Sequence, residues 1–357
     1  MSGLGSRLRV ERVRDSRLAR IEDWSRVPFA SVMADHMLVT EYSDGEWRDA
    51  CIRPYGPLTL SPAISALQYG ISVFEGLKAQ RIQNGALALF RARENARRLN
   101  SSAKRLAMPE VPEELLLGGL RELLRLDQSW VPPSGQGALY IRPCLFSTDE
   151  SIRVKPADRY LLVIFTFPFG EYYAAAVDAM TSGHEVRAFP GGTGNVKAAG
   201  NYAAALPMDE RARAAGFHTT LWLDAREHAY VEECGVMNVF FVIGDEIVTP
   251  GLDGTILPGV TRDSVITLLR DMGRPVRERR VGIDEIIAAH ERGLLHECFG
   301  TGTAATLTHI RRIHHAGRDI ALPPIEDHGI GTQARERLVA IATGRAVDRH
   351  GWLDIVC

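Results

Sequence analysis

The chain has 357 residues, a formal net charge of -2 and 45% hydrophobic residues, a composition typical of soluble globular proteins large enough for two ordinary domains. Because 42 basic residues nearly balance 44 acidic ones, we expect no nucleic-acid partner and a small-molecule ligand instead. The five cysteines are scattered and never spaced as C-x-x-C, which argues against a metal site or a disulfide framework and favours a reducing compartment.

Residues 1–24 are rich in Arg and Asp and lack the apolar segment of a signal peptide. No run of 18 apolar residues is present that could span a membrane. We therefore expect a partly flexible N-terminal extension, no membrane partner and a cytoplasmic location.

Residues 25–170 are predicted to form a small domain of mixed α and β structure. "LALFRARENARRLNSSAKRL" has apolar residues at helical spacing, whereas "ALYIRPCLF" and "RYLLVIFTF" are typical of strands. The helical positions are Leu89, Ala92, Ala96, Leu99 and Ala103.

The composition changes over residues 171–185, which are predicted to connect this domain to a larger α/β domain over residues 186–357. In the second domain "TTLWLD" indicates a strand, and "VFFVIGDEIVTP" indicates a hairpin turning at Gly244 and Asp245. "TRDSVITLLRDMG" predicts a helix that ends at Gly273, and the last residues predict a helix end and a short strand.

The stretch "GGTGNVKAAGNYAAAL" contains a single charged residue, Lys197, among glycines and other small residues. A solvated surface lysine is one interpretation. A phosphate-binding P-loop is disfavoured, because Val196 and Ala198 stand where that motif requires Gly and a hydroxyl residue. The third interpretation is a nucleophilic amine that forms a Schiff base, for which close backbone approach and small neighbours are suitable.

If the carbonyl partner is pyridoxal phosphate, the chain must also supply an acid for the ring nitrogen and a phosphate site. Glu233 in "YVEECGVMNVFF" is the candidate acid, with Glu232 predicted on the opposite strand face; an exposed strand-end glutamate is the alternative. "GTILPGVTRDS" predicts a turn followed by a helix start that favours an anion, although an ordinary capped helix would look the same. "FGTGTAATL" is a second turn rich in small and hydroxyl residues.

In this order, the stretches resemble the branched-chain amino acid aminotransferase family of fold-type IV pyridoxal-phosphate enzymes. The resemblance extends over nearly the whole chain, from "FASVMADHM" through "ISVFEGLKAQR", "LFRARENARRL", "ALYIRPCLF", "GGTGNVKAAGNY", "EECGVMNVFF", "TILPGVTRDSV" and "FGTGTAATL" to "GRAVDRHGW". It implies a two-domain α/β fold with mixed α+β sheets, pyridoxal 5'-phosphate between the domains, and transamination between Leu, Ile or Val and 2-oxoglutarate.

The resemblance also assigns residues. Lys197 would be the catalytic Schiff-base lysine, and Glu233 would keep the pyridine nitrogen protonated. The other expected cofactor-binding residues are Arg91, Tyr202, Leu257, Gly259, Val260, Thr261 and Thr303. The expected substrate-binding residues are Tyr69, Phe74, Tyr140, Arg142, Arg153, Thr303, Ala304 and Ala305.

Among these, Arg142 would bind the side-chain carboxylate of glutamate, the backbone at Thr303–Ala305 would bind the α-carboxylate, and Arg153 would reach the site of a partner in a homodimer. The plainer alternatives are core aromatic residues for Phe74 and Tyr140 and structural or surface roles for Arg91 and Arg142.

Several positions depart from the family's pattern. "FASVMADHM" has Ala30, Met33 and Ala34 where Gly, Phe and Thr are usual; Gln80 replaces an aromatic residue and Arg153 a glycine. No cysteine follows the "GTGTA" turn, so redox control through a C-x-x-C pair is not expected. The changes leave open a specialised aminotransferase acting on an unusual β-branched, aromatic or polar amino acid. D-amino acid aminotransferases, fold-type IV lyases and a non-catalytic binding protein are the further alternatives.

Overall fold

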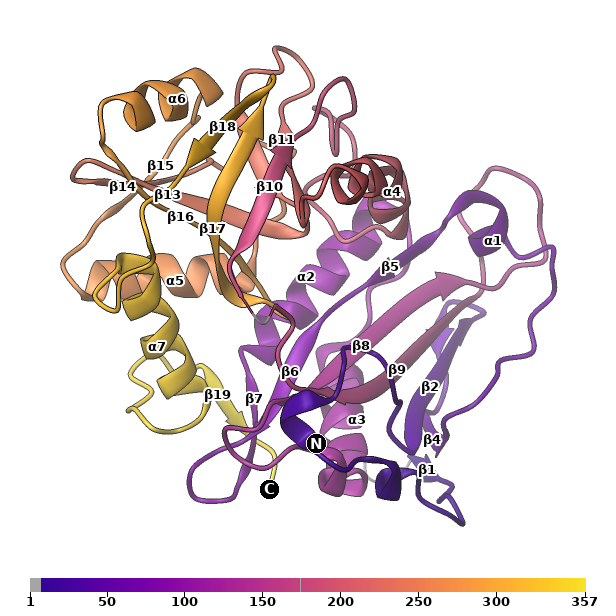
Figure 1. Ribbon diagram of the computed structural model, residues 1–357. Coiled ribbons are helices and arrows are strands. Elements are labelled where there is room, and N and C mark those ends of the chain that lie inside the picture. The colour runs from indigo at the N-terminus through magenta and orange to yellow at the C-terminus, as the bar shows by residue number, and fades with distance from the viewer. Residues whose placement is uncertain (1–7, 174) are drawn as a thin grey trace. The chain divides into compact units, whose positions relative to one another are not determined.

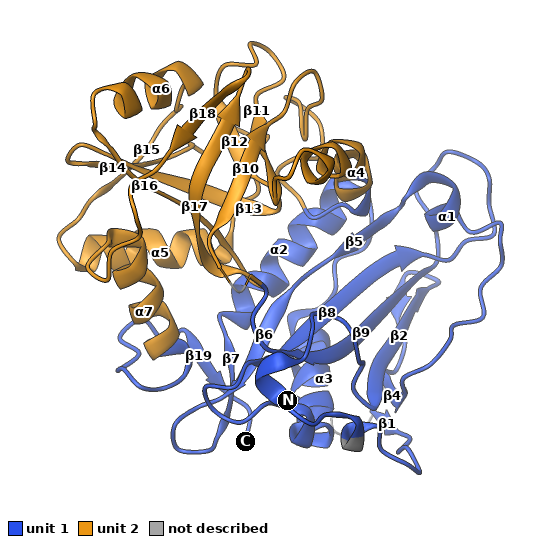
Figure 2. Cartoon of the chain, in the orientation of Figure 1, with its two compact units in different colours: residues 1–172, 197–200, 341–357 blue, residues 173–196, 201–340 orange. Residues whose placement is uncertain are grey.

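A computed structural model describes residues 8–173 and 175–357, and its internal contacts divide the chain into two compact units (Figures 1 and 2). The first unit contains residues up to 172, residues 197–200 and residues from 341 onward. The second unit contains residues 173–196 and 201–340. Residues 1–7 of the expected N-terminal extension lie outside the described residues.

The first unit is built on a ten-stranded sheet with the order β1-β4-β2-β9-β8-β6-β7-β19, in which β3 pairs with β2 and β5 pairs with β8. The strands are β1 Arg9–Val10, β2 His36–Ser43, β3 Glu46–Trp47, β4 Cys51–Pro54, β5 Ser72–Phe74, β6 Leu77–Arg81, β7 Leu87–Phe90, β8 Ala138–Ser147, β9 Tyr160–Phe169 and β19 Leu353–Ile355. The last strand, β19, joins the edge of this sheet by antiparallel pairing with β7. The end of the chain therefore completes the unit formed by its beginning.

The helices of this unit are α1 Ser65–Tyr69, α2 Ala92–Arg105 and α3 Glu113–Leu126. Helix α2 buries Ala92, Ala96, Leu99 and Ala103 along one face, and the buried leucines of α3 join the same core. The helix predicted from this spacing is confirmed, as are the two strands that became β8 and β9. Leu89 was wrongly included in the helical pattern: it lies on β7, and the helix begins only after Arg91.

The second unit contains a nine-stranded sheet with the order β12-β11-β10-β17-β16-β13-β14-β15, in which β18 pairs with β17. Its strands are β10 Val177–Thr181, β11 Thr219–Leu223, β12 Val231–Cys234, β13 Met237–Ile243, β14 Glu246–Thr249, β15 Val276–Glu278, β16 Leu295–Gly302, β17 Thr306–His315 and β18 Arg318–Ala321. An additional pairing of β12 with β13 closes six of these strands into a ring. Closure leaves fewer unpaired strand edges and buries both faces of β12 and β13.

The remaining helices are α4 Ala199–Ala214, α5 Val260–Asp271, α6 Ile283–Glu291 and α7 Ile330–Ala342. The predicted hairpin at Gly244 and Asp245 joins β13 to β14, and Gly244 has the positive φ of 56° that favours glycine there. The predicted helix α5 is followed by Gly273 at φ 70°. Strand β10 lies within the residues that the composition suggested as a connection. The sequence did not indicate this strand, because five residues are too few for a distinct periodic signal.

Among the described residues, no helix is both long enough and apolar enough to cross a membrane.

Candidate active site

Lys197 is fixed through its backbone to the first unit. Its N–H donates to Ser102 Oγ on α2 at 3.0 Å, and its carbonyl accepts from Phe74 N at 3.1 Å. The next residue, Ala198, forms an isolated antiparallel bridge with Val73 on β5. Three backbone contacts with two elements thus determine where the lysine side chain begins.

The Lys197 amine lies 4.7 Å from the centre of the Phe74 ring, and its charge acts on Glu75. Glu75 is 1% exposed; its carboxylate accepts from Arg98 Nε at 2.6 Å and from Asn95 Nδ2 at 2.9 Å. Burial alone would raise the pKa of Glu75, but the charge and hydrogen bonds of Arg98, aided by Lys197 and Asn95, hold that pKa below its ordinary value. A buried ionised carboxylate therefore contributes to the electrostatic environment of the lysine.

Arg142 lies on β8 with its guanidinium carbon 4.6 Å from the Phe74 ring centre and 5.5 Å from that of Tyr140. Its Nε is buried and has no hydrogen-bond partner among the described residues. A buried guanidinium donor of this kind is costly unless a ligand or water satisfies it. The position is suitable for an anionic group of a substrate.

Tyr140 is 6% exposed and is stacked on Phe167, with ring centres 5.0 Å apart. Its hydroxyl lies where a side chain at residue 76 would begin: a Cβ on Gly76 would be 1.9 Å from Tyr140 Oη. Glycine at this position leaves room for the tyrosine hydroxyl, so "FEG" and "LYIR" are coupled by packing.

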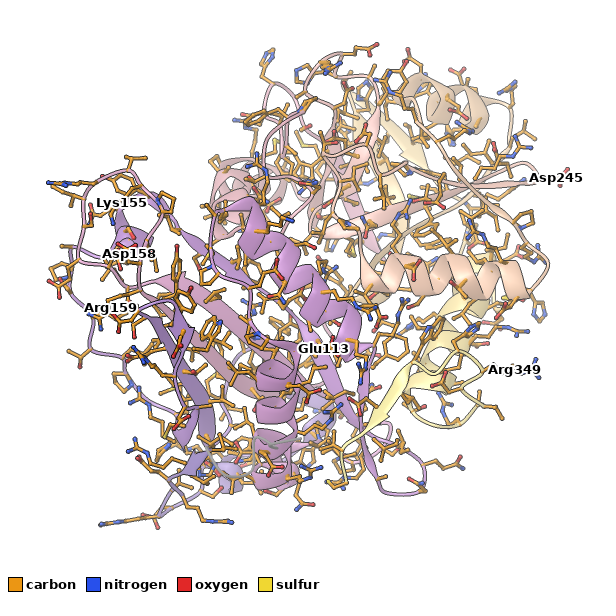
Figure 3. The ribbon with its side chains drawn as sticks, turned by 180° about the vertical axis from the view of Figure 1, so that it is seen from behind. Glu113, Lys155, Asp158, Arg159, Asp245 and Arg349 are labelled. Carbon is orange, nitrogen blue, oxygen red and sulfur yellow. The ribbon has the colours of Figure 1, made fainter. Side chains whose placement is uncertain are left out.

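Tyr69 ends α1, and its hydroxyl donates to the carbonyl of Ile152 in the loop of residues 148–159. Asp149 closes this loop by accepting from the N–H groups of Asp158 and Arg159, and Lys155 pairs with Asp158 at 2.6 Å (Figure 3). Arg153 is exposed on the same loop.

Arg91 is the N-cap residue of α2 and has a left-handed backbone, with φ 52° and ψ 39°. This region is uncommon for residues other than glycine. Its N–H donates to the carbonyl of Trp352 at 2.7 Å, and its guanidinium carbon lies 5.2 Å from the Trp352 ring centre. The side chain of Arg91 is 10% exposed.

Glu233 is buried on β12 of the second unit and is 4% exposed. Its Oε1 accepts from Leu257 N at 2.7 Å and lies 3.2 Å from Arg187 Nη2. Arg187 also donates to the carbonyls of Gly194 and Thr255. One arginine therefore connects the carboxylate to the glycine-rich stretch that precedes Lys197 in the sequence.

Glu232 is also buried, at 5% exposed, and its Oε1 accepts from the Thr255 hydroxyl at 2.6 Å. Its Oε2 is buried without a hydrogen-bond partner among the described residues. Burial raises the pKa of Glu232 to about 7, against the opposing effects of the Thr255 hydrogen bond and the Arg187 charge; Asp253 and Glu233 raise the pKa further. Two buried carboxylates thus lie near one arginine, and the pKa of Glu232 is raised toward neutrality.

Helix α5 begins directly after Gly259, which is its N-cap and has no side chain to cap the first turn. A Cβ at Gly259 would lie 2.0 Å from Asn238 Oδ1, so only glycine fits there. Val260 and Thr261 form the first turn of this 12-residue helix, and Leu257 lies two residues before the N-cap. A helix start with a glycine N-cap can bind an anion through its N–H groups and its dipole.

Thr303, Ala304 and Ala305 form the turn between β16 and β17 and are half-buried. The residue that ends this turn, Thr306, has φ 59°, which is an outlier for a β-branched residue. Tyr202 lies in the first turns of α4 and is half-buried. The predicted ligand residues of the second unit are therefore located on a helix start, a strained turn, a strand and α4.

Several residues that support the candidate site were not anticipated from the sequence. They are Ser102, Glu75, Asn95, Arg98, Arg187, Asn201, Thr255 and Trp352. Only Asn201 had a local signal for its contacts, since it follows the lysine in the same motif and closes the preceding turn by donating to the carbonyls of Thr193 and Val196. The others act through contacts that are distant in sequence.

The side chains of the two units, taken separately, match the chemistry of an aromatic aldehyde that carries a ring nitrogen and a phosphate. In the first unit a lysine amine can condense with the aldehyde and an arginine can bind a phosphate; in the second unit a buried carboxylate can pair with a protonated ring nitrogen and a helix start can bind an anion. Binding such an aldehyde requires a lysine, an acid and an anion site, whereas binding a metal ion requires a cluster of His, Cys or acidic ligands.

Comparison with known proteins agrees with this chemistry. The sequence model of the family "Amino-transferase class IV" matches residues 72–313. The branched-chain-amino-acid transaminase 1 of Bacillus subtilis is 43% identical over 335 residues, which cover 92% of this chain and 94% of that protein.

Solved structures give the same result. The branched-chain amino acid aminotransferase from Escherichia coli aligns with a TM-score of 0.73 and 28% identity over 90% of this chain and 99% of its own. The branched-chain aminotransferase from the thermophilic archaeon Thermoproteus uzoniensis, solved with norvaline, aligns with a TM-score of 0.74 and 27% identity over 90% of this chain and 100% of its own. The expected two-domain α/β architecture is thereby confirmed.

Glu75→Gln should destabilise the protein by about 3 to 5 kcal/mol, because it leaves the buried Arg98 without a carboxylate. Glu75→Gln combined with Arg98→Met, which removes both charges, should recover most of the loss. Urea unfolding of both variants measures the difference. A double variant as unstable as the single one would contradict the importance of the unpaired charge.

Glu232→Gln should remove a pH dependence of stability. The unfolded carboxyl ionises near its ordinary pKa of 4.5, whereas the folded one keeps its proton up to about 7. In this window the native state binds the extra proton, so the free energy of unfolding of the wild type should fall as pH rises, by about 3 kcal/mol at most. The difference between wild type and variant, followed by urea unfolding across this window, checks the prediction.

Glu114→Gln, at an exposed position of α3, is the matched control and should show no such dependence. A wild-type-minus-Glu232→Gln difference that stays constant with pH would contradict the assignment.

Proposed function

Because the chain belongs to the class IV aminotransferase family, we propose that it transfers the amino group of a branched-chain L-amino acid (Leu, Ile or Val) to 2-oxoglutarate, giving a 2-oxo acid and L-glutamate. The observation that carries the proposal is the identity of 41 to 43% over more than nine tenths of the chain to bacterial proteins named as branched-chain-amino-acid aminotransferases or transaminases. The small-molecule partners are then amino acids and 2-oxo acids.

The cofactor of this family is pyridoxal 5'-phosphate; one structural relative was solved both with pyridoxamine 5'-phosphate and with N-(5'-phosphopyridoxyl)-L-glutamate. We assign Lys197 as the residue that binds it covalently and Glu233 as the partner of its ring nitrogen. Its other proposed contacts are Arg91, the N–H groups of Val260 and Thr261 after Gly259, Thr303, Tyr202 and Leu257. When bound, the cofactor supplies an electron-poor ring that accepts the electrons released as the substrate Cα–H bond breaks.

The protein's own groups then perform the proton transfers. Lys197 Nζ would accept the substrate Cα proton as a general base and later donate a proton as a general acid. The backbone bonds of Lys197 to Ser102 and Phe74 support this role, since they restrict the arc through which the amine can move. Arg187 places a positive charge 3.2 Å from the buried Glu233 carboxylate, which is the arrangement that favours an ionised acid at the ring nitrogen.

Substrate selection is assigned to an apolar wall that contains one cation. Phe74, Tyr140 and Tyr69 are proposed to accommodate an aliphatic side chain, and Arg142 is proposed to bind the second carboxylate of glutamate. The buried Nε of Arg142, which lacks a hydrogen-bond partner among the described residues, supports this assignment. The backbone of Thr303, Ala304 and Ala305 is proposed to bind the α-carboxylate.

We further propose a cytoplasmic homodimer in which the loop that carries Arg153 reaches the partner's site. Ile152 and Val154 on this loop are 70% and 86% exposed, and exposed apolar side chains next to each other are suitable for a protein–protein contact. The domain limits proposed from the sequence are residues 25–170 and 186–357.

A half-reaction tests the substrate class. The holoenzyme is mixed separately with L-Leu, L-Ile, L-Val, L-Glu, L-Phe and D-Ala, and the visible absorption of the bound cofactor is followed within one turnover. Rapid loss of absorption with the branched-chain acids and with glutamate is expected. Loss with glutamate alone would mean that the donor is a different amino acid, and loss with D-Ala alone would place the enzyme in another class.

Lys197→Ala should reduce turnover by at least about 100-fold to 10,000-fold, the contribution of a positioned proton-transfer group. Mass spectrometry after borohydride reduction should find the cofactor attached to the wild type and absent from the variant. Lys104→Ala, at an exposed position of α2, is the control and should keep both properties. A Lys197→Ala protein that transaminates at the normal rate would exclude the mechanism.

A further inference from the structure

The C-terminal segment is attached to the strand that leads into Arg91. In the antiparallel pairing of β19 with β7, Leu353 lies opposite Phe90 and Asp354 opposite Leu89. The pairing continues beyond the strand, because Leu87 N donates to the carbonyl of Cys357 at 2.8 Å. Residues 353–357 are therefore hydrogen-bonded to β7, the strand that immediately precedes Arg91 and α2.

Trp352 stands at the point where this pairing meets Arg91. The Trp352 carbonyl accepts from Arg91 N at 2.7 Å, and the Trp352 ring lies under the guanidinium at 5.2 Å. The same ring contacts Phe90 edge to face, with ring centres 5.6 Å apart. One residue thus contacts both the backbone and the side chain of Arg91.

The backbone contact occurs at a strained position. A residue other than glycine in the left-handed region is strained, and it keeps this conformation only where surrounding contacts require it. The bond from Arg91 N to the Trp352 carbonyl is such a contact.

Trp352 is itself held in place by residues of its own turn. The His350 ring is stacked on it at 4.4 Å with an interplanar angle of 22°. Asp348 closes the turn by accepting from His350 N at 3.2 Å and from Leu353 N at 2.8 Å, and Gly351 supplies a positive φ of 65°. Stacking and turn together hold the ring in one orientation.

A purely structural role explains these contacts less well. Trp352 is half-buried and, among the described residues, belongs neither to the hydrophobic core of the first unit nor to the side chains packed against it. The contacts of Trp352 are instead made with Arg91, Phe90 and His350. These contacts are therefore better explained by a role in positioning Arg91.

We propose that Trp352 is a positioning residue for the cofactor phosphate: it holds the backbone and the guanidinium of Arg91, so that the C-terminal segment sets the affinity for the phosphorylated form of the cofactor. The proposal rests on the proposed function, in which Arg91 binds that phosphate. It assigns a role to the "GRAVDRHGW" motif, which the chemistry of transamination does not otherwise use.

The test compares ligands with and without a phosphate. The full-length protein is equilibrated with pyridoxal 5'-phosphate and, separately, with pyridoxal, and the two dissociation constants are measured for wild type, Trp352→Leu and Trp352→Phe. Trp352→Leu should weaken binding of the phosphorylated ligand by about 5- to 10-fold, the size of a partly buried cation–π contact, and binding of pyridoxal by less than about twofold. Trp352→Phe, which keeps an aromatic face, should lie between the two.

Trp47→Leu is the matched control, because Trp47 is half-buried in the same unit and contacts Tyr42 rather than an arginine. It should leave both constants unchanged. Equal weakening of both ligands by Trp352→Leu, or unchanged binding by a folded variant, would overturn the proposal. If Trp352→Leu does not fold, the Trp352→Phe comparison decides by the same criteria.

Arg91→Leu separates this proposal from the proposed function. If Arg91→Leu leaves the affinity for pyridoxal 5'-phosphate unchanged, Arg91 does not bind the phosphate and the premise fails. If Arg91→Leu weakens binding but Trp352→Leu does not, the premise stands and the positioning role fails. If both hold, Trp352→Leu should add nothing in the Arg91→Leu background, since the two residues act through one group.

Discussion

A carboxylate that leaves water must be paired with a positive charge, and both units of this chain are organised around that constraint. In the first unit Glu75 is paired with Arg98 beside the lysine amine, and in the second Glu233 is paired with Arg187. In each case the arginine comes from an element distant in sequence from the glutamate. The pairings therefore join separate elements and also set the charge of the candidate site.

The second pairing also explains why Glu232 differs from its neighbour. Arg187 is within ion-pair distance of Glu233, whereas Glu232 is held by the neutral hydroxyl of Thr255 and has the charges of Asp253 and Glu233 close by. One guanidinium cannot compensate two buried negative charges, so one carboxyl group keeps its proton. Geometry thus gives Glu233 the closer guanidinium, although the two glutamates are adjacent in sequence.

The sequence predicted those parts of the fold that have a local signal. The periodicity of α2 and α5, the apolar runs of β8 and β9 and the Gly-Asp hairpin each depend on a few consecutive residues, and each was found. The start of α2 was misplaced, because Leu89 fits the helical spacing although β19 pairs with it as a strand. That partner comes more than 260 residues later, so no local pattern could reveal it.

The same distinction, between features with a local signal and features without one, applies to the candidate site. Motif order led to Lys197, Glu233 and Arg91, but it gave no information on what holds them, because a supporting residue such as Ser102 or Trp352 has no required spacing from the group that it supports.

The arginines of this chain illustrate how a support determines a function. Arg98 and Arg187 are paired with buried carboxylates at 2.6 and 3.2 Å, and most of their charge is used within the protein. Arg142 instead lies against two aromatic rings, with its guanidinium carbon 4.6 Å from the centre of the Phe74 ring and 5.5 Å from that of Tyr140. Because a ring restrains a guanidinium without neutralising it, Arg142 keeps its attraction for a carboxylate. The choice of partner, acid or aromatic, thus separates the arginines that stabilise the fold from one that is proposed to bind a ligand.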